Sequence, residues 1–236
     1  VGDGAVPAVD RVDLGDGGVG AGGGRELTQA AQHYLSGQGN ALANGLGGTA
    51  GFGENTVAVG DDNSTGAIDI TSAFGAGGIN FFGQTYTSLF INNNGNITFG
   101  QSLSSYTPNQ IGSGFNVPII AAFWADVDTG GGDTGATPGG NSTGTNNVYY
   151  DLDVPNGVLT ITWDDVGYYS SNTDLANAFQ LQLVDRGNGD FDIVFRYESI
   201  NWTTGDASGG DGGLGGTPAR AGYTAGNGQD YYELPG

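Results

Sequence analysis

The acidic residues that follow one apolar segment offer the most distinctive chemistry in this sequence. Asp126 and Asp128 come directly after the apolar run from Pro118 to Trp124, and Asp133 follows a Thr-Gly-Gly-Gly stretch. Side chains two residues apart share one face of an extended strand, so the first two carboxylates lie together and the third returns on a flexible loop. Ca²⁺ prefers carboxylate oxygens supplemented by carbonyls. The sequence predicts no required cofactor, and calcium is the ion that Asp126, Asp128 and Asp133 favour.

A structural role for the same carboxylates is the alternative. Asp126 then caps a strand end and accepts hydrogen bonds from nearby amides, while Asp128 opens a turn. No glutamate closes the segment as in an EF-hand, and the Gly-rich stretch around Asp211 does not recur as calcium repeats do. Two further acidic groups are candidates for oxygen ligands, Asp61-Asp62-Asn63 and the pair Asp206 with Asp211.

Catalytic arrangements find little support. His33 is the only histidine, it falls outside the β-rich region, and there is no cysteine, which argues against acyl-transfer triads and thiol chemistry. Carboxylate pairs such as Asp126 and Asp128, or Glu198, satisfy the residue types of a glycosidase, but nothing in the sequence indicates the raised pKa that a general acid needs. We therefore predict that the chain is not an enzyme.

Aromatic residues are candidates for contact with a ligand such as a sugar. Trp124, Trp163 and Trp202 occur in strongly apolar or alternating segments and are expected in the core. Tyr168 and Tyr169 lie between Gly167 and Ser170, and we expect this pair to be exposed and available as a ligand contact.

Alternating segments predict the elements that position these residues. Leu89 and Ile91, then Ile97 and Phe99, flank an Asn92–Asn96 turn as in a β-hairpin. The run from Pro118 to Trp124 is typical of a strand covered on both faces. Three later segments, around residues 159–163, 179–183 and 191–197, alternate again. The pattern predicts an all-β fold, an antiparallel β-sandwich or barrel-like domain, with one short N-terminal helix over Glu26 to Ser36.

Charge excludes two classes of partner. The chain carries 25 acidic and 5 basic residues, all five arginine, for a net charge of -20. Nucleic-acid binding and adsorption to an anionic membrane both need a basic face that five arginines do not supply. No apolar run approaches the length of a membrane-spanning helix, so we predict neither nucleic acid nor membrane insertion.

The combination of segments resembles one known family. The resemblance rests on these segments in order: Phe81-Phe82-Gly83 with Tyr86, Leu89 to Asn92, Asn94 to Phe99, Pro118 to Asp128, Thr162-Trp163, Phe179 to Leu181, Phe191 to Tyr197, Ile200 to Trp202, Gly205 to Gly210 and Ala221 to Tyr223. Together they resemble the nidogen-like (NIDO) domain of extracellular matrix and cell-adhesion proteins. The cysteine-free chain and its closing segments, Gly226 to Gly228 and Tyr232 to Gly236, look more like bacterial secreted members than animal ones. The resemblance implies a non-catalytic β-domain that is secreted or at the cell surface.

The region before the resemblance divides into an arm and a connection. Residues 1–24 form a glycine-rich arm, residues 25–51 a short helix and connection, and residues 52–236 the NIDO-like domain. The arm contains one apolar stretch whose composition is typical of a short edge strand, and its candidate assembly residues are Val6, Val9, Val12 and Leu14. A glycine tether allows this stretch to add to the sheet of a neighbouring subunit. The alternative is that the arm folds back on its own domain.

These features predict an extracellular, non-enzymatic structural or adhesion protein. Its most concrete mechanism is self-assembly into a filament or matrix through the N-terminal arm, with itself or matrix components as partners. The alternative is a monomeric, calcium-assisted carbohydrate- or protein-binding adhesion module.

Overall fold

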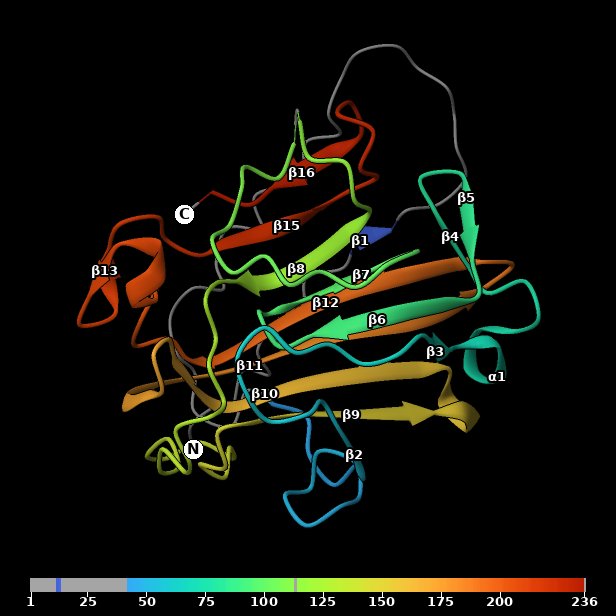
Figure 1. Ribbon diagram of the computed structural model, residues 1–236. Coiled ribbons are helices and arrows are strands. Elements are labelled where there is room, and N and C mark those ends of the chain that lie inside the picture. Colours follow the sequence, from blue (N-terminus) through green and yellow to red (C-terminus); the bar gives the residue numbers. More distant parts are fainter. Residues whose placement is uncertain (1–11, 14–41, 113, 236) are drawn as a thin grey trace, which may run out of the picture.

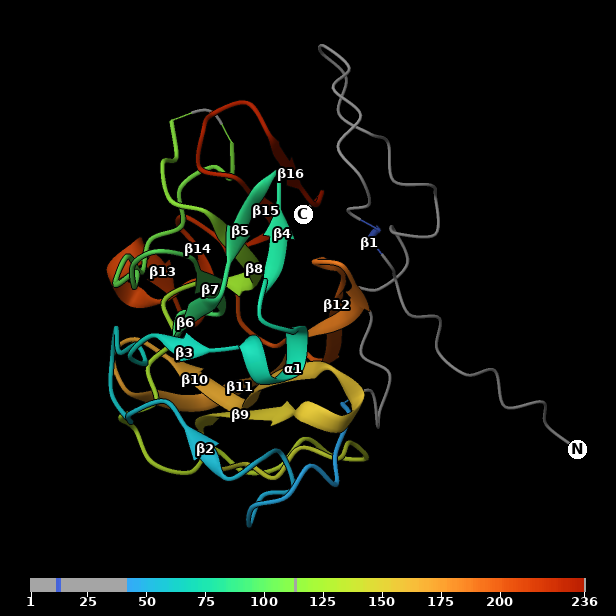
Figure 2. The same ribbon diagram turned by 90° about the vertical axis from the view of Figure 1, so that its right-hand side faces the viewer.

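The computed structural model describes residues 12–13, 42–112 and 114–235, and it shows an all-β sandwich (Figure 1). One antiparallel sheet has the strand order β1 (Val12–Asp13), β12 (Asp190–Ser199), β11 (Asn172–Gly187), β10 (Val158–Tyr168), β9 (Asn147–Asp153) and β2 (Asn55–Thr56). The other has the order β16 (Tyr231–Glu233), β15 (Arg220–Thr224), β8 (Ile119–Trp124), β7 (Asn96–Thr98), β6 (Ser88–Asn92) and β3 (Ile68–Asp69). Figure 2 shows the two sheets as separate layers, so the predicted sandwich is confirmed and no barrel closes.

Short hairpins and helical turns lie outside the two main sheets. Two small hairpins pair β4 (Ile79–Phe81) with β5 (Gln84–Tyr86), and β13 (Gly210–Asp211) with β14 (Leu214–Gly215). The helical turns of the described residues are α1 (Thr71–Phe74), η2 (Val154–Asn156) and η3 (Asp206–Ser208). Helix α1 was not predicted from the sequence. The amide and the hydroxyl of its first residue, Thr71, donate to the Asp69 carboxylate. The helix predicted over Glu26 to Ser36 lies outside the described residues. No helix of the described residues has the length and apolar character needed to cross a membrane.

The space between the sheets is filled by large side chains from alternate strand positions. Trp163 of β10 and Phe179 of β11 stack with ring centroids 4.8 Å apart, and Phe123 of β8 packs against Phe179 at 5.3 Å. The three tryptophans are completely buried, as predicted. Because apolar area removed from water is the main favourable term in folding, this layer holds the two sheets together.

Strand β8 is buried on both faces, as its continuous apolar sequence predicted. Ile120 and Ala122 face the space between the sheets, whereas Ile119, Ala121 and Trp124 pack under the loop that carries Ile111, Phe115 and Val117. Successive side chains of β8 lie on opposite faces only as far as Ala122. Phe123, the next residue, lies on the same face as Ala122 and also joins the inner core.

A β-bulge causes this change of facing. Gly222 of β15 pairs with Ala121 and Arg220 pairs with Trp124, so Ala122 and Phe123 together oppose Ala221. An extra residue on one strand reverses which face each later side chain takes. The Asn92–Asn96 turn, which the sequence predicted, packs against the bulge: Gly95 accepts a hydrogen bond from the Phe123 amide at 3.1 Å.

Gly95 is the residue that permits this contact. It has φ +78°, and a Cβ built on it would lie 1.7 Å from the Phe123 carbonyl oxygen. Gly83 offers a matched control, since its φ is +80° and a Cβ there meets nothing within 4 Å. We predict that Gly83→Ala lowers the free energy of unfolding by about 1 kcal/mol, the cost of a left-handed backbone. Gly95→Ala lowers it by about 3 kcal/mol or more, because the backbone of β8 has to move. Equal losses in urea unfolding would show that the turn does not support the bulge.

Candidate functional site

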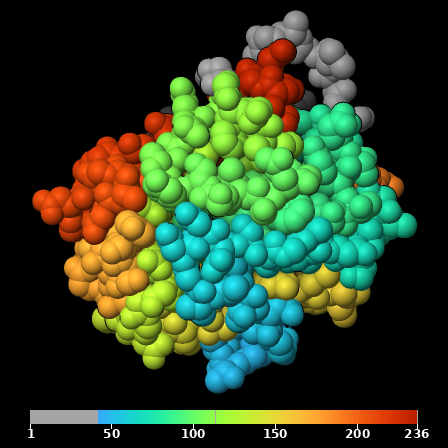
Figure 3. Space-filling model, viewed as in Figure 1, coloured from blue at the N-terminus to red at the C-terminus, as the bar shows by residue number. Residues whose placement is uncertain are grey.

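The candidate site is a corner of the sandwich where three segments meet, which we call the acidic corner. Its carboxylates come from Asp61 and Asp62 before β3 and from Asp126 and Asp128 after β8, and Asn93 and Asn94 of the β6–β7 turn lie between them. Figure 3 shows the segment before β3, in cyan, on the surface between the green loop after β7 and the yellow-green loop before β9.

Hydrogen bonds tie the three segments together. The Asn93 amide group donates to the carbonyl oxygens of Gly60 at 2.9 Å and Val127 at 3.1 Å. Asp61 forms an antiparallel bridge with Asp128, and Thr129 donates from its backbone to the Gly60 carbonyl. A further bridge, Val127 with Tyr168, joins the end of β8 to the opposite sheet. The corner is therefore a fixed part of the fold, built from residues far apart in the sequence.

Asp128 has the structural role that the sequence left open. One of its carboxylate oxygens accepts the Gly130 amide at 2.7 Å, and the other accepts the amide of Ser171 at 2.8 Å and its hydroxyl at 3.2 Å. These bonds close the turn after β8 and attach it to the β10–β11 hairpin. Asp128 thus opens a turn, with both carboxylate oxygens hydrogen-bonded.

Asp126 differs from Asp128 in having no donor for its carboxylate. Its side chain is 1% exposed, and neither Oδ1 nor Oδ2 has a hydrogen-bond partner. The strand-capping role considered from the sequence is therefore wrong for this side chain. Burial, and then the negative charges of Asp61, Asp62, Asp128 and Asp206, raise the pKa of Asp126 to about 7. Nothing in the sequence indicated this raised pKa, and a side chain so deeply buried does not reach a substrate.

Asp61 and Asp62 add to the negative charge. Burial, and then the charges of Asp62 and Asp128, raise the pKa of Asp61 to about 6, and its Oδ1 also has no donor. Burial raises the pKa of Asp62, while the Asn94 amide, which donates to it at 2.6 Å, lowers it. The sequence identified Asp61-Asp62-Asn63 as a candidate by itself, without any signal that it joins Asp126.

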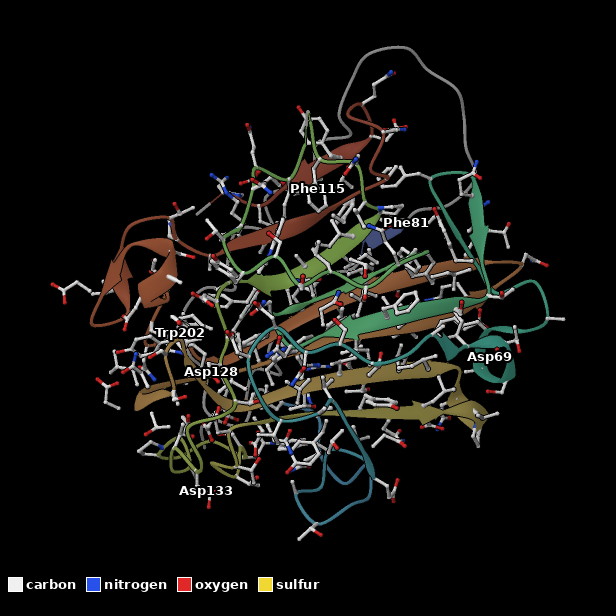
Figure 4. The ribbon with its side chains drawn as sticks, viewed as in Figure 1. Asp69, Phe81, Phe115, Asp128, Asp133 and Trp202 are labelled. Carbon is white, nitrogen blue, oxygen red and sulfur yellow. The ribbon has the colours of Figure 1, made fainter. Side chains whose placement is uncertain are left out.

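Asp133 stands apart from the other predicted ligands. It is exposed on the long loop before β9, and Figure 4 shows it well away from Asp128. Among residues 42–112 and 114–235, no three carboxylates or histidines are grouped closely enough to hold a metal ion. The predicted set of Asp126, Asp128 and Asp133 is not assembled in this arrangement. Of the other predicted pair, the negative charge of Asp206 helps to raise the pKa of Asp126, whereas Asp211 is exposed in β13.

Three buried carboxylates, Asp164, Asp165 and Glu198, hold the loop of residues 129–145, and only Glu198 was considered from the sequence, as a glycosidase carboxylate. Asp164 accepts the amides and hydroxyls of Thr143 and Thr145. Asp165 accepts the Gly144 amide, and Glu198 accepts the amides of Asn141 and Ser142. The signal available in the sequence was the Asp164-Asp165 pair inside a strand that is otherwise uncharged, because buried carboxylates need donors.

The two tyrosines proposed as ligand contacts have different environments. Tyr168 is 2% exposed, packs against Trp202 with ring centroids 5.4 Å apart and donates to Asp174. The expectation that it is exposed is wrong, because the bridge to Val127 draws it into the core. Tyr169 is half-buried, and its role as a ligand contact stays a prediction.

Of the candidate assembly residues, the structure describes only Val12. Val12 and Asp13 form β1, which pairs antiparallel with Ile193 and Asp192 of β12. Val6, Val9 and Leu14 lie outside the described residues.

The hydrogen bonds between Asp164 and the loop of residues 129–145 lead to a prediction with a matched control. Asp164→Asn retains the shape of the side chain but replaces one acceptor oxygen by an amide group that faces the same donors. We expect it to lower the free energy of unfolding by about 2–4 kcal/mol and to speed proteolytic cleavage within residues 129–145. Asp153→Asn, at exposed hydrogen bonds to Asn156, is expected to cost about 1 kcal/mol or less. Equal effects of the two variants on unfolding and cleavage would show that Asp164 does not hold the loop.

Comparison with known proteins finds one matching family and several similar proteins. A sequence model described as the nidogen-like domain matches residues 87–236. Alpha-tectorin of Mus musculus is 37% identical over 169 residues, covering 66% of this chain and 8% of the relative. Alpha-tectorin of Gallus gallus is 34% identical over 189 residues, which cover 75% of this chain and 9% of the relative. Nidogen of Drosophila melanogaster is 30% identical over 175 residues, which cover 67% of this chain and 12% of the relative. The chain thus spans only about a tenth of the length of these relatives.

No solved structure matches the chain. The sandwich extends upstream of the family match, because β2 and β3 precede residue 87 and pair with β9 and β6. The matched region nevertheless contains most strands of both sheets, the bulged β8 and the Asp126–Asp128 segment. On this match the chain belongs to the nidogen-like domain family.

Proposed function

We propose that this chain is an extracellular, non-enzymatic structural domain that takes part in adhesion or matrix building and assembles with its own copies through the N-terminal arm. Membership of the nidogen-like family supports the extracellular structural role. The acidic composition, with few cations, supports partners other than nucleic acid or anionic membranes. The three relatives compared above are animal proteins, and assignment to bacterial secreted members rests only on the cysteine-free sequence and its closing segments.

The observation that carries the self-assembly proposal is the pairing of β1 with β12. Within the described part of the chain, the outer edge of β12 takes register partners only at Asp192 and Ile193. A sheet edge offers main-chain donors and acceptors to any strand of suitable sequence. The same edge therefore accepts the arm of its own chain or that of a neighbour.

The length of the chain between β1 and residue 42 allows the strand that pairs with β12 to come either from the same chain or from a neighbouring copy. Positions 14–41, between β1 and the continuously described chain, comprise 28 residues. At about 3.5 Å per extended residue they can span at most about 100 Å. Arm exchange between neighbours in one direction generates a ring or a filament. The alternative, a monomeric calcium-assisted binding module, corresponds to an arm that stays on its own domain.

Substitution of the apolar stretch tests this proposal. We predict rings or filaments of the unmodified chain in negative-stain electron microscopy. Replacement of Val6, Val9, Val12 and Leu14 by serine is expected to give dispersed particles, because the exchanged strand loses its apolar contacts. Val19→Ser, in the glycine tract of the same arm, is the control and is expected to assemble normally. Dispersed particles of the unmodified chain, or assembly unaffected by the four serines, would contradict arm exchange.

A further inference from the structure

Asp126 stands out among the buried carboxylates of the described residues. Six carboxylates are less than a tenth exposed: Asp126, Asp128, Asp164, Asp165, Asp192 and Glu198. Five of them accept hydrogen bonds from loop amides, hydroxyls or an arginine. Asp126 accepts none at either oxygen. A buried carboxylate without donors or a counter-charge is costly, so this one requires a partner that is neither an amide nor a hydroxyl of its surroundings.

The other unpartnered atoms of the acidic corner are also oxygens. Oδ1 of Asp61 and Oδ1 of Asn93 are buried without a donor, which makes four such oxygens with the two of Asp126. The Asn93 amide nitrogen already donates to two carbonyls, Gly60 and Val127, so the orientation of this amide leaves its oxygen as the free acceptor. Four acceptors and no donor form the ligand composition of a hard cation.

The charge of the corner has the sign that such an ion needs. Each charged group that shifts the pKa of Asp126 is a carboxylate, and each shifts it upward. Gly205 packs directly on the Asp126 carboxylate, since a Cβ there would lie 2.5 Å from Oδ2. The carboxylate is thus enclosed by backbone on that side, and its charge has no counter-charge among the neighbours that act on it.

We propose that the acidic corner binds a divalent cation, calcium in preference to magnesium, through the carboxylates of Asp126 and Asp61 and the amide oxygen of Asn93. Two carboxylates with an amide oxygen, completed by carbonyls and water, are compatible with the finding that no three acidic side chains are grouped in the described residues. Calcium is preferred because it accepts mixed oxygen ligands in irregular geometry, whereas magnesium demands a near-octahedral set. Asp128, whose oxygens are hydrogen-bonded, and Asp133, on the exposed loop, are not ligands.

The proposed cation site does not depend on arm exchange, so cation binding is measured separately from assembly. The full chain is titrated with CaCl₂, and separately with MgCl₂, by isothermal titration calorimetry and thermal unfolding after treatment with EDTA. We expect calcium to bind with one strong site and to raise the melting temperature in proportion to the logarithm of its concentration above the dissociation constant. Magnesium is expected to bind more weakly.

Three variants that each remove one negative charge identify the ligands. Asp126→Asn and Asp61→Asn are each expected to weaken calcium binding by about tenfold or more. Asp126→Asn breaks no hydrogen bond of its side chain, and Asp61→Asn provides a second test at a less buried position. Asp133→Asn is the charge-matched control and is expected to bind calcium normally.

Three results would overturn the proposal. Absence of calcium binding by the unmodified chain would mean that water or a proton partners Asp126. Equal affinity of Asp126→Asn, Asp61→Asn and the unmodified chain would place the ion elsewhere. A loss in Asp133→Asn as large as that in Asp126→Asn would favour the loop carboxylates as ligands.

Discussion

The arrangement of the acidic corner depends on the bulge in β8. Because Ala122 and Phe123 together oppose Ala221, the side chains after them exchange faces. Phe123 and Val127 then enter the inner core, while Asp126 and Asp128 point to the other side of the strand. Without the extra residue, the two aspartates would face the apolar layer between the sheets, where ionised carboxylates are not tolerated.

Buried carboxylates in this fold have two different environments. Around residues 129–145, Asp164, Asp165 and Glu198 replace the regular hydrogen bonding that an irregular loop lacks. Their negative charge is stabilised by several short charge-assisted bonds, which are stronger than bonds between neutral groups. At the acidic corner the donors are absent, and the neighbouring carboxylates increase the cost of ionisation. The first arrangement explains how a long, glycine-rich loop stays attached to the sheet, and the second points to a bound ligand of positive charge.

Much of the fold was predictable because buried strands have clear patterns. The alternation in β10, β11 and β12, the apolar run of β8 and the Asn-rich turn before β7 all correspond to observed strands and turns. The short α1 was not predictable, since four residues carry no helical period. Tyr168 was misplaced because its burial results from a contact with Val127 on the opposite sheet, which no local pattern encodes.

The candidate site was predictable only in part. Asp126, and Asp61 and Asp62 that lie near it in the fold, were recognisable from the sequence as candidate oxygen ligands of a cation. The sequence analysis grouped Asp126 with Asp128 and Asp133, however, because these are close to it in the chain. Their actual partners follow from pairing between segments 34 and 67 residues apart in the sequence. The bulge that turns Asp126 away from the core lies in a stretch with no charge, glycine or proline to mark it.

The most direct test for a cation at the acidic corner is diffraction from crystals of the protein grown with terbium chloride in place of calcium chloride. Terbium is an oxygen-seeking cation with strong anomalous scattering. One dominant anomalous peak is expected within coordination distance of the Asp126 and Asp61 carboxylates. Ordered water hydrogen-bonded to Asp126, with anomalous peaks only at exposed carboxylates such as Asp133, would contradict it.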